Sequence, residues 1–333
     1  MAAAPVHVLV LFGPTAVGKT SVVEALFTGS GARGAEIVSA DSMQVYKGMD
    51  IGTAKPSAGL RERLPHHLID IRTPDQSYNA GDFVHLAEEA IARIAGRGAL
   101  PVVSGGTGFY LKNFIMGLPE APPSDERVRR ALKAELREQG AEALARELAA
   151  CDPVSAARIH INDEYRLLRA LEVFRLAGKP LSAFSMNAAP ADDPRASRPE
   201  SSGNRRDKYR FLILALERPR EDLYRRINER CALMFKNGLA DEVRSLAASG
   251  YGPLCPGMRA IGYREFFDDR NYAGGGADTA SIEALVAQHS RNYAKRQMTY
   301  FASIPNTVWI RADEKPVEKI KAFLNAAPLD AWL

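Results

Sequence analysis

Apolar residues occur in short continuous runs that alternate with segments of helical periodicity. Residues 6–12 form one such run, and residues 36–40 and 209–217 repeat the pattern, which is typical of buried parallel strands. In residues 83–94 the apolar positions recur every three or four residues, as in an amphipathic helix, and Gly96 follows. This alternation predicts an α/β protein with a parallel sheet flanked by helices and ligands at the carboxyl ends of the strands.

The pattern changes after about residue 115. A helix with Ser124 as its N-cap is expected there, and further helical segments continue to Gly178. Residues 187–207 are rich in Pro, Ser, Asp and Arg without periodicity, so we expect a mobile loop. The sequence therefore predicts a core of residues 1–114 and 209–333, interrupted by a mostly helical insertion domain at residues 115–208.

Two other segments complete the predicted core. Residues 42–76 form a polar connection that is too long for a turn, and loops of this length are usually functional or disordered. Helices are expected at residues 220–238 and 281–302, with a last strand at residues 306–312.

Composition narrows the class of protein. Of 333 residues, 46% are hydrophobic and 25% are charged, as in a soluble globular protein. No apolar run reaches the ~18 to 20 residues that span a bilayer, so no membrane partner is expected. The first residues, MAAAPVHVLVLF, lack a charged region before the apolar run, which indicates a strand and not a signal peptide. The net charge of +4 permits a polyanionic partner without requiring one.

The three cysteines lie far apart and show no C-x-x-C spacing. Cys151, Cys231 and Cys255 therefore suggest neither a zinc site nor a disulfide framework, and we expect a cytoplasmic protein. Five histidines also lack metal-ligand spacing and are interpreted as surface or capping residues: His66, His67, His85, His160 and His289.

A phosphate-binding loop follows the first predicted strand. Residues 13–20, GPTAVGKT, fit the pattern G-x-x-x-x-G-K-[ST], with a strand before the loop and a helix after it. In such loops backbone N–H groups hold phosphate oxygens, Lys19 would neutralise them, and the Thr20 hydroxyl suits Mg²⁺. The motif predicts a phosphate site without saying what carries the phosphate.

Two polar residues are expected at neighbouring strand ends. Asp41 follows the second strand and is read either as a general base or metal ligand, or as a turn cap. Thr107, between glycines, either donates a hydrogen bond into the site or belongs to a tight turn. Position alone does not decide between these alternatives.

Several longer segments carry a family resemblance. With the phosphate loop, they closely resemble the tRNA dimethylallyltransferase (isopentenyl-tRNA transferase) family from about residue 8 to residue 311. The segments are IVSADSMQVYKGMDIGTAKP, PHHLIDI, GGTGFYLK, DPVSAARIHINDEYRLLRALEVF, AIGYREF and YAKRQMTYF.

The resemblance implies a P-loop NTPase-like fold and a prenyl transfer. In this family the loop binds the diphosphate of dimethylallyl diphosphate, and the prenyl group passes to N6 of the adenine at tRNA position 37, next to the anticodon. Catalytic roles are implied for Asp41 as base, Thr107 in the reaction channel and Lys19 on the diphosphate, with Mg²⁺ on Thr20. The implied diphosphate-binding residues are Gly13, Pro14, Thr15, Ala16, Val17, Gly18, Lys19, Thr20, Ser21 and Arg226.

The resemblance also implies that the tRNA anticodon arm is the partner and that its target base is flipped out. The insertion would grip the arm, although residues 113–208 hold 16 Lys and Arg against 15 Asp and Glu. Nothing in the chain demands a dimer, so a monomer is expected. The implied tRNA-binding residues are Asp41, Ser42, Met43, Gln44, Thr107, Arg129, Tyr165, Arg166, Leu167, Leu168, Arg169, Arg259, Ala260, Ile261, Gly262, Tyr263, Arg264, Lys295, Arg296 and Gln297.

The chain departs from the family pattern at three places. The usual TWFR ends here in Ala302, residues 255–259 are a local variant, and the zinc finger of eukaryotic members is absent, which indicates the bacterial form. Three alternatives stay open: an adenylate isopentenyltransferase, an ATP-dependent kinase, and a non-catalytic RNA-binding protein. The insertion argues against the first, and Lys19 and Asp41 would have no purpose in the last.

Overall fold

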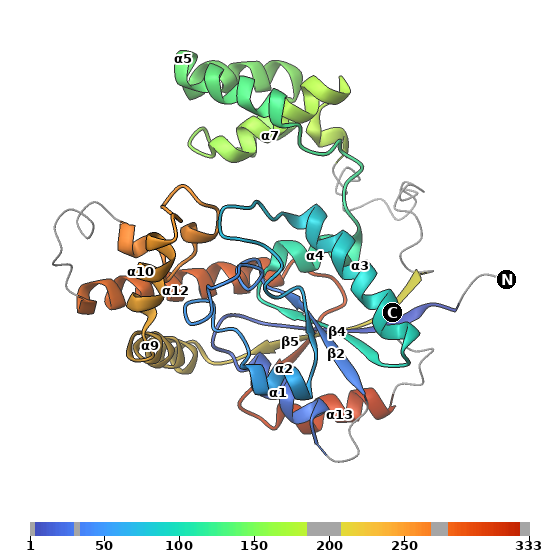
Figure 1. Ribbon diagram of the computed structural model, residues 1–333. Helices are drawn as coiled ribbons and strands as arrows, with labels where there is room; N and C mark the ends of the chain where they lie inside the picture. The colour runs from blue at the N-terminus through green and yellow to red at the C-terminus, as the bar shows by residue number, and fades with distance from the viewer. Residues whose placement is uncertain (1–3, 30–33, 185–207, 268–278, 327–333) are drawn as a thin grey trace. The chain divides into compact units, whose positions relative to one another are not determined.

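The computed structural model describes residues 4–29, 34–184, 208–267 and 279–326. Six parallel strands form one sheet in the order β3-β2-β4-β1-β5-β6. The predicted α/β fold is confirmed, and helices cover both faces of the sheet (Figure 1). The strands are β1 (Val6–Phe12), β2 (Ala35–Ala40), β3 (His66–His67), β4 (Leu100–Gly105), β5 (Tyr209–Glu217) and β6 (Val308–Arg311).

The chain divides into two compact units, Met1–Met116 with Asn204–Leu333, and Gly117–Gly203. The first unit contains the sheet and most of the described helices. The mobile loop predicted at residues 187–207 lies outside the described residues. Helices of the first unit are α1 (Lys19–Phe27), α2 (Ala58–Arg63), α3 (Ala80–Gly96), α4 (Gly108–Met116), α9 (Arg220–Lys236), α10 (Leu239–Ala248), η2 (Gly257–Arg259), η3 (Arg264–Phe267), α12 (Thr279–Phe301) and α13 (Pro316–Ala326).

Strand β1 shows how the sequence pattern builds two layers. Its side chains alternate, so Leu9 and Leu11 pack into the core beneath α1, α9, α12 and α13. Val8, Val10 and Phe12 point to the opposite face and pack against α3 and α4. Because both faces are buried, the strand reads as a continuous apolar run.

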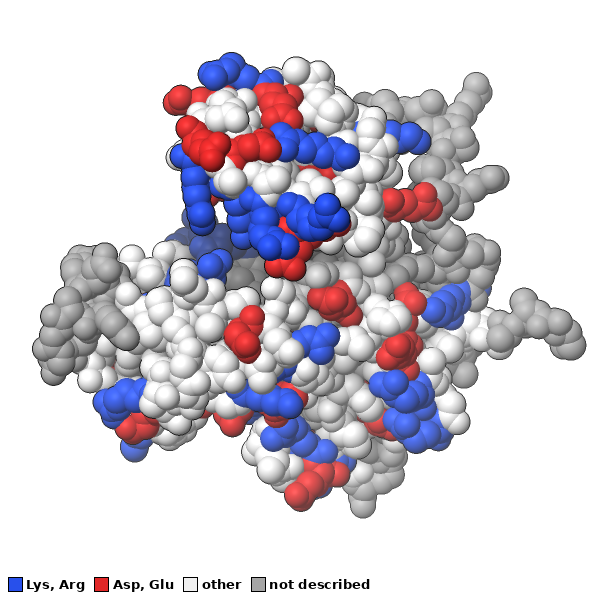
Figure 2. Space-filling view, turned by 45° about the horizontal axis from the view of Figure 1, so that its top comes forward, with Lys and Arg blue, Asp and Glu red and all other residues white. Residues whose placement is uncertain are grey.

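The second unit is helical in its described part. It contains α5 (Glu126–Cys151), α6 (Pro153–Ala156), α7 (Glu164–Ala177) and η1 (Leu181–Phe184). Buried leucines of α5 and α7 form its core, and Gly140 interrupts α5 with a positive φ of 79°. Basic and acidic side chains are interspersed over its visible surface, at the top of Figure 2.

Some local predictions were wrong. Asp125, not Ser124, caps α5 with its side chain, and the Ser124 hydroxyl donates instead to buried Glu172 at 2.6 Å. The connection at residues 42–76 holds α2 and β3, where His66 and His67 form the edge strand. Helices α10 and α13 were not predicted. No described helix is both long enough and apolar enough to cross a membrane.

Candidate active site

The phosphate loop joins β1 to α1, as predicted. Gly13 has no room for a side chain, because a Cβ there would lie 2.7 Å from the Leu216 carbonyl oxygen. Gly18 adopts a left-handed conformation with φ 111° and is the N-cap of α1, so its lack of a Cβ lets the loop turn into the helix. Backbone N–H groups at the start of α1 therefore face the space that the loop encloses.

Lys19 lies across this loop. Its Nζ donates hydrogen bonds to the carbonyl oxygens of Gly13 and Pro14, at 2.8 and 2.9 Å. The pKa of Lys19 is lowered to about 7, mainly by burial and also by the nearby charge of Arg230, while the charge of Asp41 opposes the shift. A bound polyanion would restore the charged form, because an opposite charge nearby favours the protonated amine.

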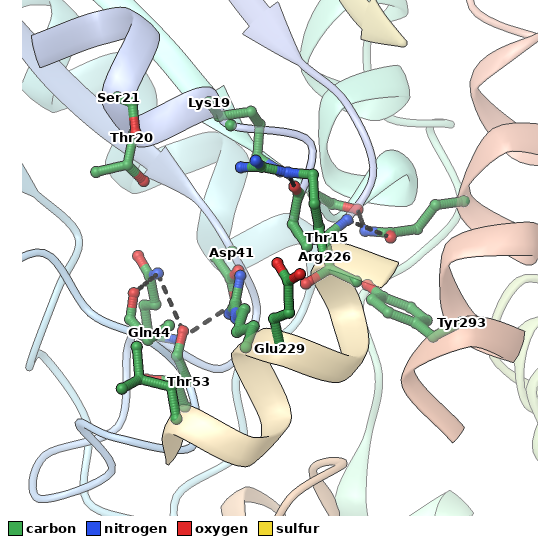
Figure 3. Close-up of a pocket in the computed structure, with 17 residues that line it drawn as sticks. Thr15, Lys19, Thr20, Ser21, Asp41, Gln44, Thr53, Arg226, Glu229 and Tyr293 are labelled. Carbon is green, nitrogen blue, oxygen red and sulfur yellow. Dashed lines mark hydrogen bonds between the residues drawn. The ribbon is translucent and has the colours of Figure 1, made fainter. Parts of the chain in front are cut away.

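A cavity of about 390 Å³ opens in front of the loop (Figure 3). Lys19, Thr20 and Ser21 enter it from α1, and Arg226 and Glu229 from α9. Its other lining residues are Thr15, Ala16, Gly18, Asp41, Gln44, Thr53, Ala54, Gly106, Arg230, Leu233, Tyr293 and Gln297.

Two arginines one turn apart on α9 supply further positive charge. Arg226 Nε donates to the Ala16 carbonyl oxygen at 2.9 Å, which ties the side chain to the phosphate loop. Desolvation lowers the pKa of Arg230, while the charge of Asp41 raises it. With Lys19, the two guanidinium groups form a three-cation surface suited to a polyanion.

Asp41 lies at the end of β2 and lines this cavity. Its Oδ1 accepts hydrogen bonds from the backbone N–H groups of Met43, at 2.9 Å, and Gln44, at 3.4 Å. The carboxylate is thus a turn cap, and it also faces the space where chemistry would occur. The two readings left open by the sequence are compatible.

Thr107 lies behind the Asp41 turn. Its hydroxyl oxygen accepts from the Ser42 backbone N–H at 3.0 Å and lies 3.3 Å from the Ser42 hydroxyl. Among the described residues it does not line the cavity; Tyr293 of α12 does. Burial raises the pKa of Tyr293 to about 12, the charge of Asp41 contributes, and hydrogen bonds with Thr107 and Gln297 oppose the rise.

Gln297 connects α12 to two strand ends. Its Oε1 accepts from the Thr15 backbone N–H at 2.9 Å, and its Nε2 donates to the Gly106 carbonyl oxygen at 2.7 Å. The side chain is buried, so both of its polar groups are committed to the site's own backbone.

A second cavity, of about 300 Å³, adjoins the first. Both are lined by Thr15, Asp41, Thr53, Arg230 and Tyr293, so these residues mark the boundary between the two. More apolar side chains line the second cavity than the first, and the second carries two further arginines. Its remaining lining residues are Ser42, Met43, Gly52, Ile227, Cys231, Met234, Ala260, Ile261, Arg264, Val286, Ser290 and Arg296.

The residues expected to bind RNA fall into an exposed group and a buried group. Arg259, Arg264, Lys295 and Arg296 are exposed in the first unit, and Arg264 and Arg296 also line the second cavity. Five others have buried side chains, and of these Ala260 and Gln297 line the cavities: Leu167, Leu168, Ala260, Tyr263 and Gln297.

In the helical unit two expected RNA contacts form a stacked pair. The guanidinium carbon of Arg129 lies 4.8 Å from the centre of the Tyr165 ring, which is 66% exposed. Arg169 is less available, because it donates to Glu172 at 2.8 Å and to the Pro122 carbonyl oxygen at 2.6 Å. Arg166 is exposed beside its partner Asp163.

The oxygen atoms around the phosphate loop set the chemistry of any metal site. Thr20 and Ser21 present hydroxyls, and Asp41 and Glu229 present carboxylates, which are the hard oxygen ligands that Mg²⁺ prefers. Within the described ranges, no group of three or more His, Cys, Asp or Glu side chains could hold a metal. The donor set therefore fits a cation that shares its ligands with a bound phosphate.

Several residues that line the two cavities were not predicted, among them Thr53, Glu229, Arg230 and Tyr293. Arg220, Arg226, Ile227 and Arg230 fit the spacing R-x₅-R-I-x₂-R of the family that the sequence resembles, but only Arg226 was assigned to the diphosphate. Tyr293 and Thr53 belong to YAKRQMTYF and IVSADSMQVYKGMDIGTAKP, two of the segments that carry the family resemblance, but neither residue was assigned a role.

Comparison with known proteins shows the family to which the chain belongs. A family model described as IPP transferase matches residues 44–304. The chain belongs to the IPP transferase family. A curated relative from Geobacter sulfurreducens, a tRNA dimethylallyltransferase, is 43% identical over 302 residues, which cover 91% of each chain. A tRNA dimethylallyltransferase from Geobacter metallireducens is 44% identical over 304 residues, which cover 91% of this chain and 92% of the relative.

Solved structures agree with the fold. The tRNA isopentenylpyrophosphate transferase of Bacillus halodurans is 35% identical, with a TM-score of 0.64 and 96% coverage of both chains. A eukaryotic dimethylallyltransferase acting on tRNA is 24% identical with a TM-score of 0.74, and this likeness supports the fold alone.

Proposed function

We propose that this protein transfers the dimethylallyl group of dimethylallyl diphosphate to N6 of adenine 37 in tRNA. The products are N6-dimethylallyladenosine and diphosphate. One observation carries the proposal: Asp41 stands where a cation-lined phosphate cavity adjoins a second, more apolar cavity. The named relatives act on tRNA, which supports the acceptor.

The phosphate cavity would hold the donor. Backbone N–H groups at the start of α1 would bind the diphosphate, and Lys19, Arg226 and Arg230 would neutralise it. Charge stabilisation of this kind is worth most at the leaving group, where negative charge grows as the allylic C–O bond breaks. Thr20 would hold Mg²⁺, with Glu229 as a further oxygen donor nearby, and the ion when bound would add charge stabilisation to the leaving diphosphate.

Asp41 would act on the acceptor. An exocyclic adenine amine is a weak nucleophile, so removal of its proton as the C–N bond forms assists the attack. The Asp41 carboxylate takes that proton, and the allylic oxygen leaves with the diphosphate, which balances the reaction. Thr107 supports the carboxylate through the Ser42 backbone, and Tyr293 keeps its own proton near neutral pH because burial raises its pKa.

The second cavity would receive the flipped adenine. Its apolar side chains suit the stacking of a base. Its arginines suit the phosphate groups of the RNA backbone next to that base. Further contacts to the anticodon arm are assigned to the helical unit, at the Arg129–Tyr165 pair, because guanidinium and aromatic faces stack well on bases. We propose that the enzyme works as a monomer in the cytoplasm.

A transfer assay tests the proposal. Radiolabelled dimethylallyl diphosphate and Mg²⁺ are offered to a tRNA anticodon stem-loop with adenine at position 37, to the same stem-loop with guanine there, and to free AMP. Label on the adenine stem-loop alone is expected. Label on AMP would move the function to nucleotide prenylation, and protection from thermal unfolding by ATP but not by dimethylallyl diphosphate would favour a kinase.

A further inference from the structure

A loop without regular structure forms one wall of both cavities. Thr53 lines both of them, Ala54 lines the first, and Gly52 lines the second. Backbone of this kind has no ladder of hydrogen bonds to hold its shape, so its N–H groups need partners from elsewhere. The partner of three successive N–H groups is a single side chain on α10.

Glu242 is that side chain. Its Oε2 accepts from the backbone N–H groups of Asp50 and Ile51, at 2.9 and 2.8 Å, and its Oε1 accepts from that of Gly52 at 3.2 Å. The Tyr263 hydroxyl donates to the same Oε1 at 2.6 Å. One carboxylate thus takes four hydrogen bonds, and charge-assisted bonds of this kind are stronger than neutral ones.

Close packing fixes the same point of the loop. Tyr263 is fully buried, and a Cβ added to Gly52 would lie 2.5 Å from its ring. Burial raises the pKa of Tyr263, with a contribution from the charge of Glu242, so the phenol remains a donor. Gly52 therefore lies between a ring on one side and the Glu242 carboxylate on the other.

The loop is connected to Asp41 through Gln44. Gln44 Nε2 donates to the carbonyl oxygens of Thr53 and Ala54, at 3.3 and 3.4 Å, and its Oε1 lies 3.0 Å from the Ser39 hydroxyl. The backbone N–H of Gln44 is one of the two that bond Asp41. A displaced loop would thus shift the turn that aims the carboxylate.

We propose that Glu242 is a positioning residue that holds the cavity wall, and through it the Asp41 turn, in the geometry needed for transfer. This inference rests on the proposed function. Glu242 touches no substrate: it lines neither cavity, and it acts through the backbone of residues 50–54.

Glu242→Gln tests the inference with little change in volume. Glutamine keeps one acceptor oxygen and places an NH₂ group against donors, so at least one of the four hydrogen bonds is lost. We expect the single-turnover rate constant to fall about tenfold, as a mispositioned reacting group costs rate without losing its chemistry. The Kd for dimethylallyl diphosphate should change less than threefold, because Lys19 and Arg226 are untouched.

Asp241→Asn is the matched control. Asp241 precedes Glu242 on α10, its side chain is 76% exposed, and its partner is Arg244 at the surface. This variant should match the wild type in rate and in Kd. A single-turnover rate constant is chosen because it does not depend on the fraction of enzyme that is folded, so simple destabilisation would leave it unchanged.

Two further measurements keep the test decisive. Tyr263→Phe removes one donor and leaves the carboxylate, so a smaller fall of about threefold is expected, and this variant serves if Glu242→Gln does not fold. Hydrogen exchange at residues 50–54 should be faster in Glu242→Gln than in Asp241→Asn, a result that does not require any transfer activity. Wild-type rates in both Glu242→Gln and Tyr263→Phe, or unchanged exchange, would overturn the inference; an inactive wild type would instead overturn the proposed function.

Discussion

The two ends of the site are built in different ways. The phosphate end comes mainly from one continuous stretch, residues 13–21, with Arg226 and Arg230 added from α9. The other end is assembled from loops after β2, from α9, from residues 260–264 and from α12. A binding site for a common chemical group can be local, whereas a site that must bring two substrates together is built from the whole fold.

Asp41→Asn should show the largest difference between the two ends of the site, because it should slow the transfer while leaving the binding of the donor unchanged. The amide keeps the shape of the turn but cannot take the amine proton, so the single-turnover rate constant should fall by about 10³-fold. Calorimetry should show wild-type binding of dimethylallyl diphosphate, because the loop cations are unchanged. A single-turnover rate constant within threefold of the wild-type value would show that Asp41 is not the general base.

Arg230→Met tests a residue that belongs to both cavities. Loss of a cation that lines the phosphate cavity should lower the single-turnover rate constant about 10²-fold and also weaken the binding of the donor. Arg220→Met, a change on the same helix at a residue outside both cavities, is the control. Equal effects of the two variants would show that position on the helix, and not contact with the site, is what matters.

Tyr293→Phe should have a smaller effect. It removes a hydroxyl that hydrogen-bonds with Thr107 and Gln297 but takes no charge from the site, so a loss of about tenfold in rate is expected. Because burial raises the pKa of Tyr293 to about 12, the wild-type rate should show no loss from its ionisation up to pH 10. A falling limb below pH 10 that disappears in the phenylalanine variant would contradict this.

Lys19 gives the phosphate end a pH signature. With a pKa of about 7 in the free protein, Lys19 is mostly neutral at pH 8, and a bound diphosphate raises that pKa. Binding then takes up a proton, so affinity should weaken as the pH rises above 7, by up to about tenfold per unit. The dependence of binding enthalpy on the buffer measures this uptake. Lys19→Arg, which stays protonated, should abolish the proton uptake. An equal uptake in that variant would show that a group other than Lys19 takes up the proton.

The comparison of the two ends also explains which predictions succeeded. Strands at residues 6–12 and 209–217 and the phosphate loop were predicted because buried runs and a glycine-rich motif are local signals. Helix α10 was missed although Leu239, Val243 and Leu246 have helical spacing, and β3 is too short to show any pattern. Gln297 and Tyr263 resemble RNA contacts in the sequence, but their hydrogen bonds to Thr15 and Glu242 appear only in the folded chain.

A crystal structure with a non-reactive thiolo analogue of dimethylallyl diphosphate and the adenine stem-loop tests the central claim most directly. The account predicts the diphosphate against Lys19 and Thr20, with adenine N6 about 3 Å from the Asp41 carboxylate, within hydrogen-bonding reach. A diphosphate outside the loop, or an adenine whose N6 points away from Asp41, would contradict it.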